Sequence, residues 1–331
     1  MHIRHRICAL TLACLLLLSL AACGRRTPEP ESTDPDTLVY QATYTELPEE
    51  AGDLYNVVYS GGRFYGESGS FNEETGEHVN TFVSFLPDGS DFRSVPLSLD
   101  PSAGINGFAP APDGGVWAAA RIYPTKDGEP DYTGSPSVFL LRFDAEGRET
   151  KRVDLSFAAE NDEHAYISTL FTDADGRVCF SCGEQIYVLD SEGRRLFDLT
   201  CSWISAFALT SEGRPVIGAY DRQAGFTVRE IDAAAQGFGK SYPGITNNVN
   251  TLLTGDAHYP LYAVMHDRLY GYDAATDSLT EILSFLELDI LSDSLITVAR
   301  TGEDLFTAFV RGDDGRAQMC SIALAPAGQP K

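Results

Sequence analysis

Positive charge is scarce in this chain of 331 residues. Lysine and arginine number 24 against 48 aspartate and glutamate residues, giving a formal net charge of −24 at pH 7. Such an excess of acid repels nucleic acid and anionic membrane surfaces, so we expect no nucleic-acid partner. Cationic and neutral partners stay open, as does the simpler interpretation that the acidic surface keeps an exported domain soluble.

Long hydrophobic runs are lacking after the first 22 residues. The start is basic, with Arg4 and Arg6, and is followed by an apolar run over Ala9–Ala22. This run is too short for an ordinary membrane span and is typical of an export signal. No later segment is long and apolar enough to cross a membrane, so we expect the rest of the chain to be exported and soluble.

The export signal ends in Leu20-Ala21-Ala22-Cys23, which resembles the lipobox of bacterial lipoproteins. The resemblance implies cleavage before Cys23 and acylation of its sulfur, which would anchor the protein to the outer face of the cell membrane. An ordinary secretory signal and an uncleaved anchor are the alternatives. Cleavage would remove Arg4 and Arg6 and leave 22 basic against 48 acidic residues, a formal charge of −26.

The stretch after Cys23 lacks large apolar side chains. Gly24–Thr37 is rich in Pro, Glu, Asp, Ser and Thr, a composition that predicts a disordered tether. The expected organisation is therefore a lipoprotein signal peptide at residues 1–22, a tether at 23–37 and one folded domain at 38–331.

Cysteine is scarce as well, with four residues after Cys23. Cys179 and Cys182 form a Cys-x-x-Cys, which suits half of a zinc site or a redox pair. No second such motif or closely spaced His pair supplies further zinc ligands, and in an extended strand the two Cα atoms lie roughly 10 Å apart, too far for a disulfide. We therefore predict unpaired, partly buried thiols and no metal. A disulfide within the motif or to Cys201 and a metal site are the alternatives.

What the chain does have is short strands separated by glycine-containing turns. The clearest unit is Tyr166–Leu199, in which Asp175-Gly176 and Glu192-Gly193 form two of the turns. Its predicted strands are Tyr166–Thr172, Arg177–Ser181, Gln185–Leu189 and Arg194–Leu199. Four antiparallel strands in about 35 residues correspond to one blade of a β-propeller.

Similar units recur along the chain. They are predicted at Leu54–Leu99, Ile105–Leu155, Trp203–Ser241, Asn248–Phe285 and Ser294–Leu324. The last shows only three strands, whereas Leu38–Leu47 is a strand without a hairpin partner. We therefore predict an all-β fold, a monomeric β-propeller of about six four-stranded blades closed by the N-terminal strand, which completes the last blade.

A short pattern recurs in four of the innermost strands: apolar, Asn or Ser, small or Thr, apolar. The polar residue of this pattern is Asn106, Ser168, Ser205 or Asn250. These side chains are predicted to line a central channel, where they hydrogen-bond either a ligand or ordered water.

Aromatic residues open two of the same strands. Tyr166 and Trp203 would lie near one mouth of the channel, where they could stack on a sugar or another planar ligand. Packing between blades is the alternative. Asp173-Ala174-Asp175-Gly176 has some features of a calcium loop, but its glycine follows the second aspartate directly, which favours a hairpin turn.

The run Ile105–Arg121, with its Pro-Asp-Gly-Gly turn followed by Val-Trp, resembles repeats of bacterial NHL-like, streptogramin-lyase-like and two-component-regulator propellers. Ala208–Ala219 and Phe171–Phe180 are similar to the same repeats. The lipobox, acidic tether and propeller together resemble the N-terminal region of certain surface lipoproteins of Firmicutes, in which a propeller precedes a solute-binding domain. The chain would then be a stand-alone relative or a fragment.

Recognised catalytic patterns are absent. The sequence has no Gly-x-Ser-x-Gly elbow, no His-Glu-x-x-His, no P-loop and no Rossmann glycine pattern. We therefore expect a membrane-anchored binding module without enzyme activity or cofactor, which recognises a small molecule, such as a carbohydrate, or a protein. The alternative is a propeller lyase or glycoside-active enzyme that uses the channel mouth.

Overall fold

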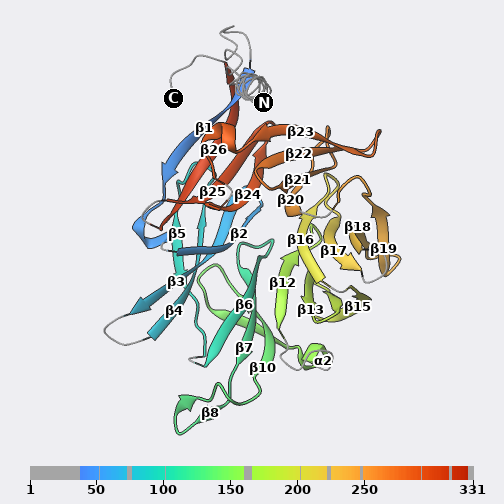
Figure 1. Cartoon of the computed structure of the whole chain (residues 1–331). Coiled ribbons are helices and arrows are strands. Elements are labelled where there is room, and N and C mark those ends of the chain that lie inside the picture. The colour runs from blue at the N-terminus through green and yellow to red at the C-terminus, as the bar shows by residue number, and fades with distance from the viewer. Residues whose placement is uncertain are drawn as a thin grey trace, which may run out of the picture. The chain divides into compact units, whose positions relative to one another are not determined.

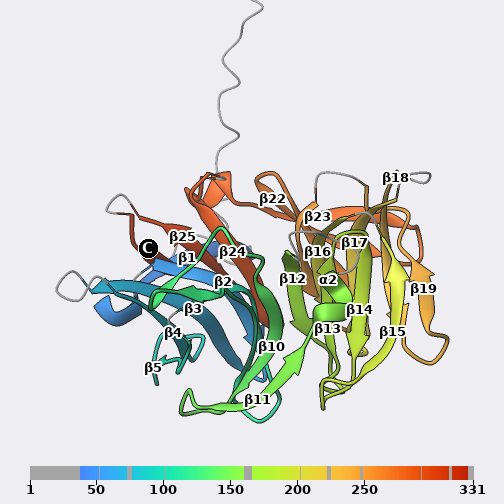
Figure 2. The same cartoon turned by 90° about the horizontal axis from the view of Figure 1, so that it is seen from below.

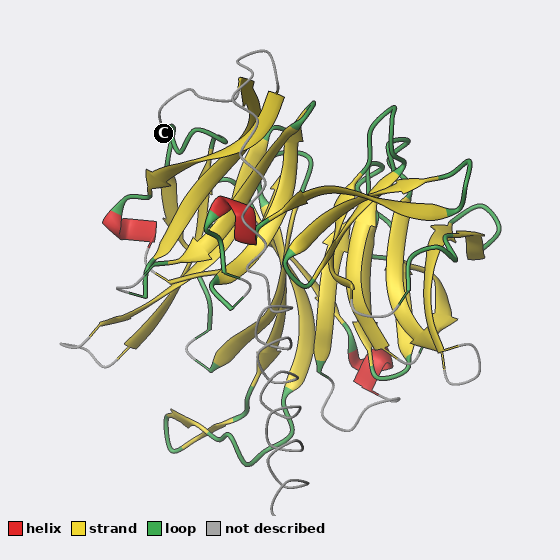
Figure 3. Ribbon diagram, turned by 45° about the horizontal axis from the view of Figure 1, so that its top comes forward, coloured by secondary structure: helices red, strands yellow, loops and turns green. Residues whose placement is uncertain are grey.

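The computed structural model describes residues 38–51, 53–72, 77–100, 102–159, 166–201, 203–221, 225–246, 249–291, 293–312 and 315–326. The predicted signal peptide, Cys23 and the tether lie outside these residues. Tyr40–Leu324 forms one compact unit. Strands dominate it, and helix is confined to three short segments of the described residues, η1 (Glu49–Ala51), α2 (Ser156–Ala159) and η2 (Leu286–Leu288), as Figure 3 shows.

The strands form six four-stranded antiparallel sheets, numbered here in chain order. Sheet 1 contains β2 (Asp53–Ser60), β3 (Arg63–Asn72), β4 (Glu77–Phe85) and β5 (Arg93–Pro96). Sheet 2 contains β6 (Ala103–Pro110), β7 (Val116–Ile122), β10 (Ser137–Phe143) and β11 (Glu149–Asp154). Sheet 3 contains β12 (Ile167–Thr172), β13 (Val178–Cys182), β14 (Gln185–Leu189) and β15 (Arg195–Thr200), which lie side by side in Figure 2.

Sheets 4 and 5 follow the same order along the chain, whereas sheet 6 also includes β1. Sheet 4 contains β16 (Trp203–Leu209), β17 (Pro215–Asp221), β18 (Gly225–Asp232) and β19 (Gly237–Ser241). Sheet 5 contains β20 (Val249–Thr254), β21 (Leu261–Met265), β22 (Arg268–Asp273) and β23 (Ser278–Ser284). Sheet 6 has the order β1-β26-β25-β24, from β1 (Leu38–Glu46), β24 (Leu295–Gly302), β25 (Leu305–Arg311) and β26 (Ala317–Pro326).

One connection within sheet 2 carries structure of its own. The connection between β7 and β10 contains a small hairpin of β8 (Thr125–Lys126) and β9 (Glu129–Pro130), which extends away from sheet 2 in Figure 1. Its turn has two positive φ angles, at Asp127 and Gly128. A residue pair of this kind makes a tight hairpin turn.

The hairpin turns are fastened by aspartate and arginine side chains. Asp173 Oδ1 accepts the N–H groups of Asp175 and Arg177 at 3.0 and 2.9 Å, while its Oδ2 pairs with Arg177 Nε at 2.6 Å. Gly176 sits in this turn at a φ of 76°, a conformation that favours glycine. The carboxylate is thus occupied by its own turn, and the prediction of a hairpin rather than a calcium loop is confirmed.

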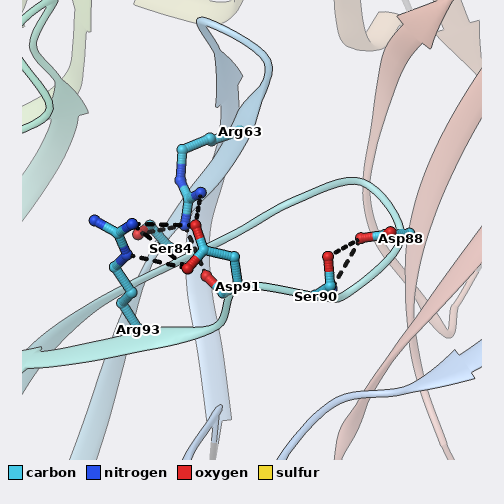
Figure 4. A network of polar contacts seen from close by, with 6 residues as sticks. All are labelled: Arg63, Ser84, Asp88, Ser90, Asp91 and Arg93. Carbon is cyan, nitrogen blue, oxygen red and sulfur yellow. Dashed lines mark hydrogen bonds and ion pairs between the residues drawn. The ribbon is translucent and has the colours of Figure 1, made fainter.

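A further network joins the turns of sheet 1 (Figure 4). Arg63, the first residue of β3, pairs with the Asp91 carboxylate at 2.5 Å and donates to the Asp91 carbonyl at 2.8 Å. Arg93 reaches the same carboxylate at 3.1 Å. The hydrogen bond from Arg63 is the main cause that lowers the pKa of Asp91, and Arg63 holds the β4–β5 connection against β3.

The six sheets surround one axis. Each innermost strand contacts the next in the cycle β2, β6, β12, β16, β20, β24 and back to β2. A separate hydrophobic cluster fills each of the six junctions between neighbouring sheets, including the junction of sheet 6 with sheet 1. This arrangement confirms an all-β propeller of six four-stranded blades, in which every sheet buries both faces against its neighbours.

The junction of sheets 6 and 1 is rich in phenylalanine. Phe309 of β25 lies edge-on to Phe64, with ring centroids 4.9 Å apart, and 5.9 Å from Phe85. All three side chains are fully buried. On the outer side of sheet 6, Tyr40 and Ala42 of β1 pack against the cluster between sheets 5 and 6. The wider prediction, that β1 seals the ring, stays a prediction.

Candidate functional site: the mouth of the central channel

A cavity of about 340 Å³ lies where the innermost strands meet. All six strands contribute to its wall, through Asn56–Ser60, Asn106–Pro110, Thr169–Thr172, Ser205–Leu209, Asn250–Thr254 and Thr297–Arg300. A cavity of this size can hold a small organic ligand. Because each blade supplies one strand, the lining is assembled from segments that are far apart in the sequence.

Every innermost strand has a β-bulge near its start. The register with the second strand shifts between Tyr55/Val58, Ile105/Gly107, Ile167/Thr169, Ile204/Ala206, Val249/Thr251 and Leu295/Thr297. The unpaired residues at these shifts are Asn56 with Val57, Asn106, Ser168, Ser205, Asn250 and Ile296. A bulge kinks the strand and redirects a side chain, so the polar residue of the sequence pattern marks a bulge.

The bulges gather at one end of the channel because the innermost strands run in the same direction. Thr172 Oγ1 donates to the Pro110 carbonyl at 2.7 Å, which joins the ends of β12 and β6. Tyr59 OH donates to the Thr301 carbonyl at 3.4 Å, which joins the last parts of β2 and β24. The strand starts therefore meet at the opposite end, which we call the bulge mouth and define by the bulge residues.

Three predicted site residues lie in the cavity wall. Asn106 is partly buried, and Ser205 and Asn250 are exposed to the channel. Ser205 Oγ donates to the Gly218 carbonyl at 3.2 Å. The side chains of the other two strand residues, Ser168 and Trp203, lie outside the described part of the structure, although their backbones belong to β12 and β16.

Tyr166 has a different setting. It precedes β12 and is 49% exposed, so it does not pack between blades. Arg121 of β7 lies over its ring, with the guanidinium carbon 5.5 Å from the ring centroid. Arg121 Nε also donates to Asn106 Oδ1 at 2.8 Å. Arg121, Asn106 and Tyr166 thus form one group beside the cavity. The sequence pointed to Asn106 and Tyr166 but not to Arg121.

A second charged group lies at the start of sheet 1. Asn56 adopts a φ of 50°, in the left-handed region, and its Nδ2 donates to Glu67 Oε2 at 3.2 Å. Burial raises the pKa of Glu67, and the hydrogen bond from Asn56 offsets this in part. Asn56 escaped the sequence pattern because the bulge of β2 contains one residue more than the others, which shifts the alignment. Glu67 lies on β3, outside the innermost strands that the pattern covers.

The opposite end of the channel carries Arg300, whose donors are occupied. Its Nη2 donates to the Gly255 carbonyl at 2.6 Å, and its Nε donates to the Thr254 carbonyl at 3.0 Å. Asp256 Oδ2 lies 3.7 Å from Arg300 Nη1. Among the residues that line the cavity, Arg300 is the one with a formal charge, so the wall at the bulge mouth is uncharged.

The cysteines are buried in the sheets. Within the described part of the chain, no disulfide joins Cys179, Cys182, Cys201 and Cys320, which confirms the predicted thiols. Burial raises the pKa of Cys179 strongly and that of Cys320 to about 11, so both stay protonated near neutral pH.

Among the described residues, no three His, Cys, Asp or Glu side chains are placed to share a metal ion, and no helix has the length and apolar character to cross a membrane.

Comparisons with known proteins give the fold. A luciferin-regenerating enzyme is similar over 87% of this chain and 95% of its own, with a TM-score of 0.52 and 11% identity. An aldose sugar dehydrogenase from Streptomyces coelicolor, in its PQQ-bound form, has a TM-score of 0.48 and 11% identity over 88% of this chain and 99% of its own.

The β-propeller domain of the Trilobed protease from Pyrococcus furiosus has a TM-score of 0.47 and 13% identity over 79% of this chain and 78% of its own. No protein-family model and no curated protein matches the sequence. At identities this low, the likeness of the first structure supports the propeller fold and gives no activity.

Proposed function

We propose that the protein is a lipid-anchored extracytoplasmic β-propeller that binds a ligand at the bulge mouth. The observation that carries the proposal is the repetition of one bulge in all six innermost strands around a single cavity. Five of the six bulges contain Asn or Ser, residues that offer both hydrogen-bond donors and acceptors. The uncharged bulge mouth, with its Asn and Ser side chains, suits an uncharged body such as a carbohydrate, and the rigid blades hold its contacts in place.

The proposed role is recognition at the cell surface, either to assist the capture of a solute or to engage a surface protein. Acylation of Cys23 would hold the propeller to the membrane through the tether of residues 23–37. In this proposal the protein is a monomer and acts without catalysis, metal or cofactor. The relationship to NHL-like and two-component-regulator propellers, and to Firmicutes surface lipoproteins, belongs to the same proposal.

The ring closure proposed here uses β1 as the outermost strand of sheet 6. Its support is the sheet order β1-β26-β25-β24 and the contact of Tyr40 with Phe306, whose ring centroids are 6.1 Å apart. Pairing the first strand with the last covers the edge of β26 and ties the two ends of the chain together.

A thermal-shift screen tests the binding function. The probes are neutral sugars, peptides and divalent metal salts, added to residues 23–331 with Cys23→Ser, and a bound probe raises the melting temperature. For a probe that binds, Asn250→Ala and Ser205→Ala should each weaken binding about fivefold, the effect of one lost hydrogen bond. Ser191→Ala, in an exposed turn of sheet 3, is the matched control and should change nothing.

If Asn250→Ala and Ser205→Ala leave the affinity of every bound probe unchanged, the proposal that a ligand binds at the bulge mouth is wrong. Stabilisation by a metal that EDTA reverses would contradict the metal-free proposal. The anchor has its own test, in which the full-length chain is expressed in a bacterium with and without Cys23→Ser. The unchanged chain should fractionate with membranes and the variant should not.

A further inference from the structure

Glu67 is a half-buried carboxylate whose setting differs from that of three other carboxylates that are removed wholly or in part from solvent. Asp173 pairs with Arg177, Glu230 pairs with Arg214 at 3.1 Å, and Asp256 faces Arg300. Glu67 contacts the neutral amide of Asn56, and no ion pair joins it to a lysine or arginine within the described ranges. A partly buried carboxylate without a cation is costly, and a cation from outside would remove that cost.

The surroundings of Glu67 suit an organic cation. Glu67 pairs across the sheet with Tyr55 on β2 and Phe82 on β4, so the three side chains share one face of sheet 1. Phe82 belongs to the cluster between sheets 1 and 2, whereas Tyr55 is 48% exposed. A carboxylate beside an open tyrosine ring offers both an ion pair and a cation–π contact to an ammonium group.

The position of Glu67 links it to the cavity. Asn56, its hydrogen-bond partner, lines the cavity wall and is the bulge residue of β2. The left-handed φ of Asn56 is a conformation that few residues other than glycine adopt readily, and it aims the amide at Glu67. Glu67 is thus joined to the cavity wall through Asn56.

The charge of the whole chain favours the same kind of ligand. With 48 acidic against 24 basic residues, the protein attracts cations and raises their concentration at its surface. The cavity wall at the bulge mouth has no charged side chain of its own, so this attraction becomes specific only where a nearby carboxylate contacts the ligand. Of the two charged groups beside the bulge mouth, Arg121 has Asn106 as an acceptor and stacks on Tyr166, while Glu67 has no cation.

We propose that Glu67, Asn56 and Tyr55 form a subsite for the ammonium group of an amine-bearing ligand held at the bulge mouth. The inference rests on the proposed binding function and deepens it by naming the ligand class. Glu67 accepts a charge-assisted hydrogen bond from the ammonium group, Tyr55 covers the cation with its ring, and Asn56 fixes the carboxylate.

Matched probes test the subsite by titration calorimetry on residues 23–331 with Cys23→Ser. Glucosamine is compared with N-acetylglucosamine, and cadaverine with 1,5-pentanediol, so that each amine has a neutral counterpart. The amines should bind about tenfold more tightly than their counterparts, the effect of one charge-assisted hydrogen bond. Glu67→Gln should abolish this difference, and Tyr55→Ala should reduce it several-fold.

Glu146→Gln is the control for overall charge. Glu146 lies in the turn between β10 and β11, pairs with Arg148 and is 65% exposed, so its removal changes the net charge by the same amount at a remote place. It should preserve the preference for amines. Circular dichroism melting curves check the fold, and Glu67→Gln should melt no lower than the unchanged protein, because it removes a buried charge.

Three results would overturn the subsite: amines that bind equally to Glu67→Gln, an equal loss in Glu146→Gln, or no binding of either amine. The proposed function is judged separately, by whether Asn250→Ala weakens the probes found in the thermal-shift screen. A neutral ligand whose binding depends on Asn250 but not on Glu67 would support the proposed binding function and contradict the proposed amine subsite.

Discussion

At the scale of single residues, the same side chain serves different purposes according to its burial. Asp173 and Asp144 occupy equivalent turn positions, and each accepts two backbone N–H groups and pairs with an arginine four residues later. The side chain of Asp173 is 1% exposed, that of Asp144 26%. Solvent screens the second pair far more than the first, so the stability of the fold depends on Asp173.

We expect Asp173→Asn to lower the free energy of unfolding by about 2–3 kcal/mol, because it leaves Arg177 beside a neutral amide in a buried place. Asp144→Asn is the matched control and should cost clearly less. Urea denaturation followed by circular dichroism measures both. Equal losses would show that burial does not distinguish the two turns.

The phenol of Tyr40 makes the free energy of unfolding depend on pH in the alkaline range. Burial, and then the neighbouring Asp304 carboxylate, raises the pKa of Tyr40 from 10.0 to about 12. The folded chain therefore keeps the phenol proton between pH 10 and 12, while the unfolded chain releases it. The contribution of Tyr40 to the free energy of unfolding is complete below pH 10 and is lost as the pH rises towards 12.

Tyr40→Phe should accordingly make the loss of stability above pH 10 less steep. The free energy of unfolding is measured by urea denaturation from pH 8 to 11. Tyr132→Phe, at a side chain that is 69% exposed, is the control and should follow the unchanged protein. An identical slope in Tyr40→Phe would contradict the expected role of this phenol.

At the scale of elements, the strands could be predicted and the bulges could not. Periodic apolar residues and glycine turns are local signals, so β14 begins and ends at the predicted residues. A bulge depends on how two strands pair, and the sequence alone gives no register. The recurring Asn or Ser was found from the sequence, but its cause became apparent only from the pairing of each innermost strand with its neighbour.

The first strand offers a test at this scale. Ala42 of β1 packs against the cluster between sheets 5 and 6, while its neighbour Thr43 is exposed. If β1 completes sheet 6, Ala42→Asp buries a charge and should lower the free energy of unfolding by about 1–3 kcal/mol. Thr43→Asp should change it by less than about 0.5 kcal/mol. Equal and small effects in urea denaturation would mean that β1 does not stabilise the ring.

At the scale of the whole molecule, stability comes from six junctions of similar construction. Each is a cluster of buried apolar side chains between two sheets, and the sixth joins the last sheet to the first. A ring of this kind has no free sheet face, so loss of one junction affects the other five. The junction of sheets 6 and 1 is the one that links segments farthest apart in the sequence.

Phe309→Ala should leave a cavity in the junction of sheets 6 and 1. The Phe309 side chain is fully buried between Phe64 and Phe85, and truncation should lower the free energy of unfolding by about 3–5 kcal/mol. Leu196→Ala, at a side chain that is 43% exposed on β15, is the control. A loss below about 1 kcal/mol in urea denaturation would show that the ring does not depend on this contact.

The sequence by itself determined the number of blades, their strands, their turns and the polar residues at Asn106, Ser205 and Asn250, because hairpins are formed by neighbours along the chain. The tertiary structure alone decided that Glu67 stands beside Asn56 without a cation and that Arg121 lies between Asn106 and Tyr166. Their positions depend on the register between strands and on the contact between blades, where segments distant in the sequence meet. For the same reason Tyr166 is exposed at the mouth rather than packed between sheets.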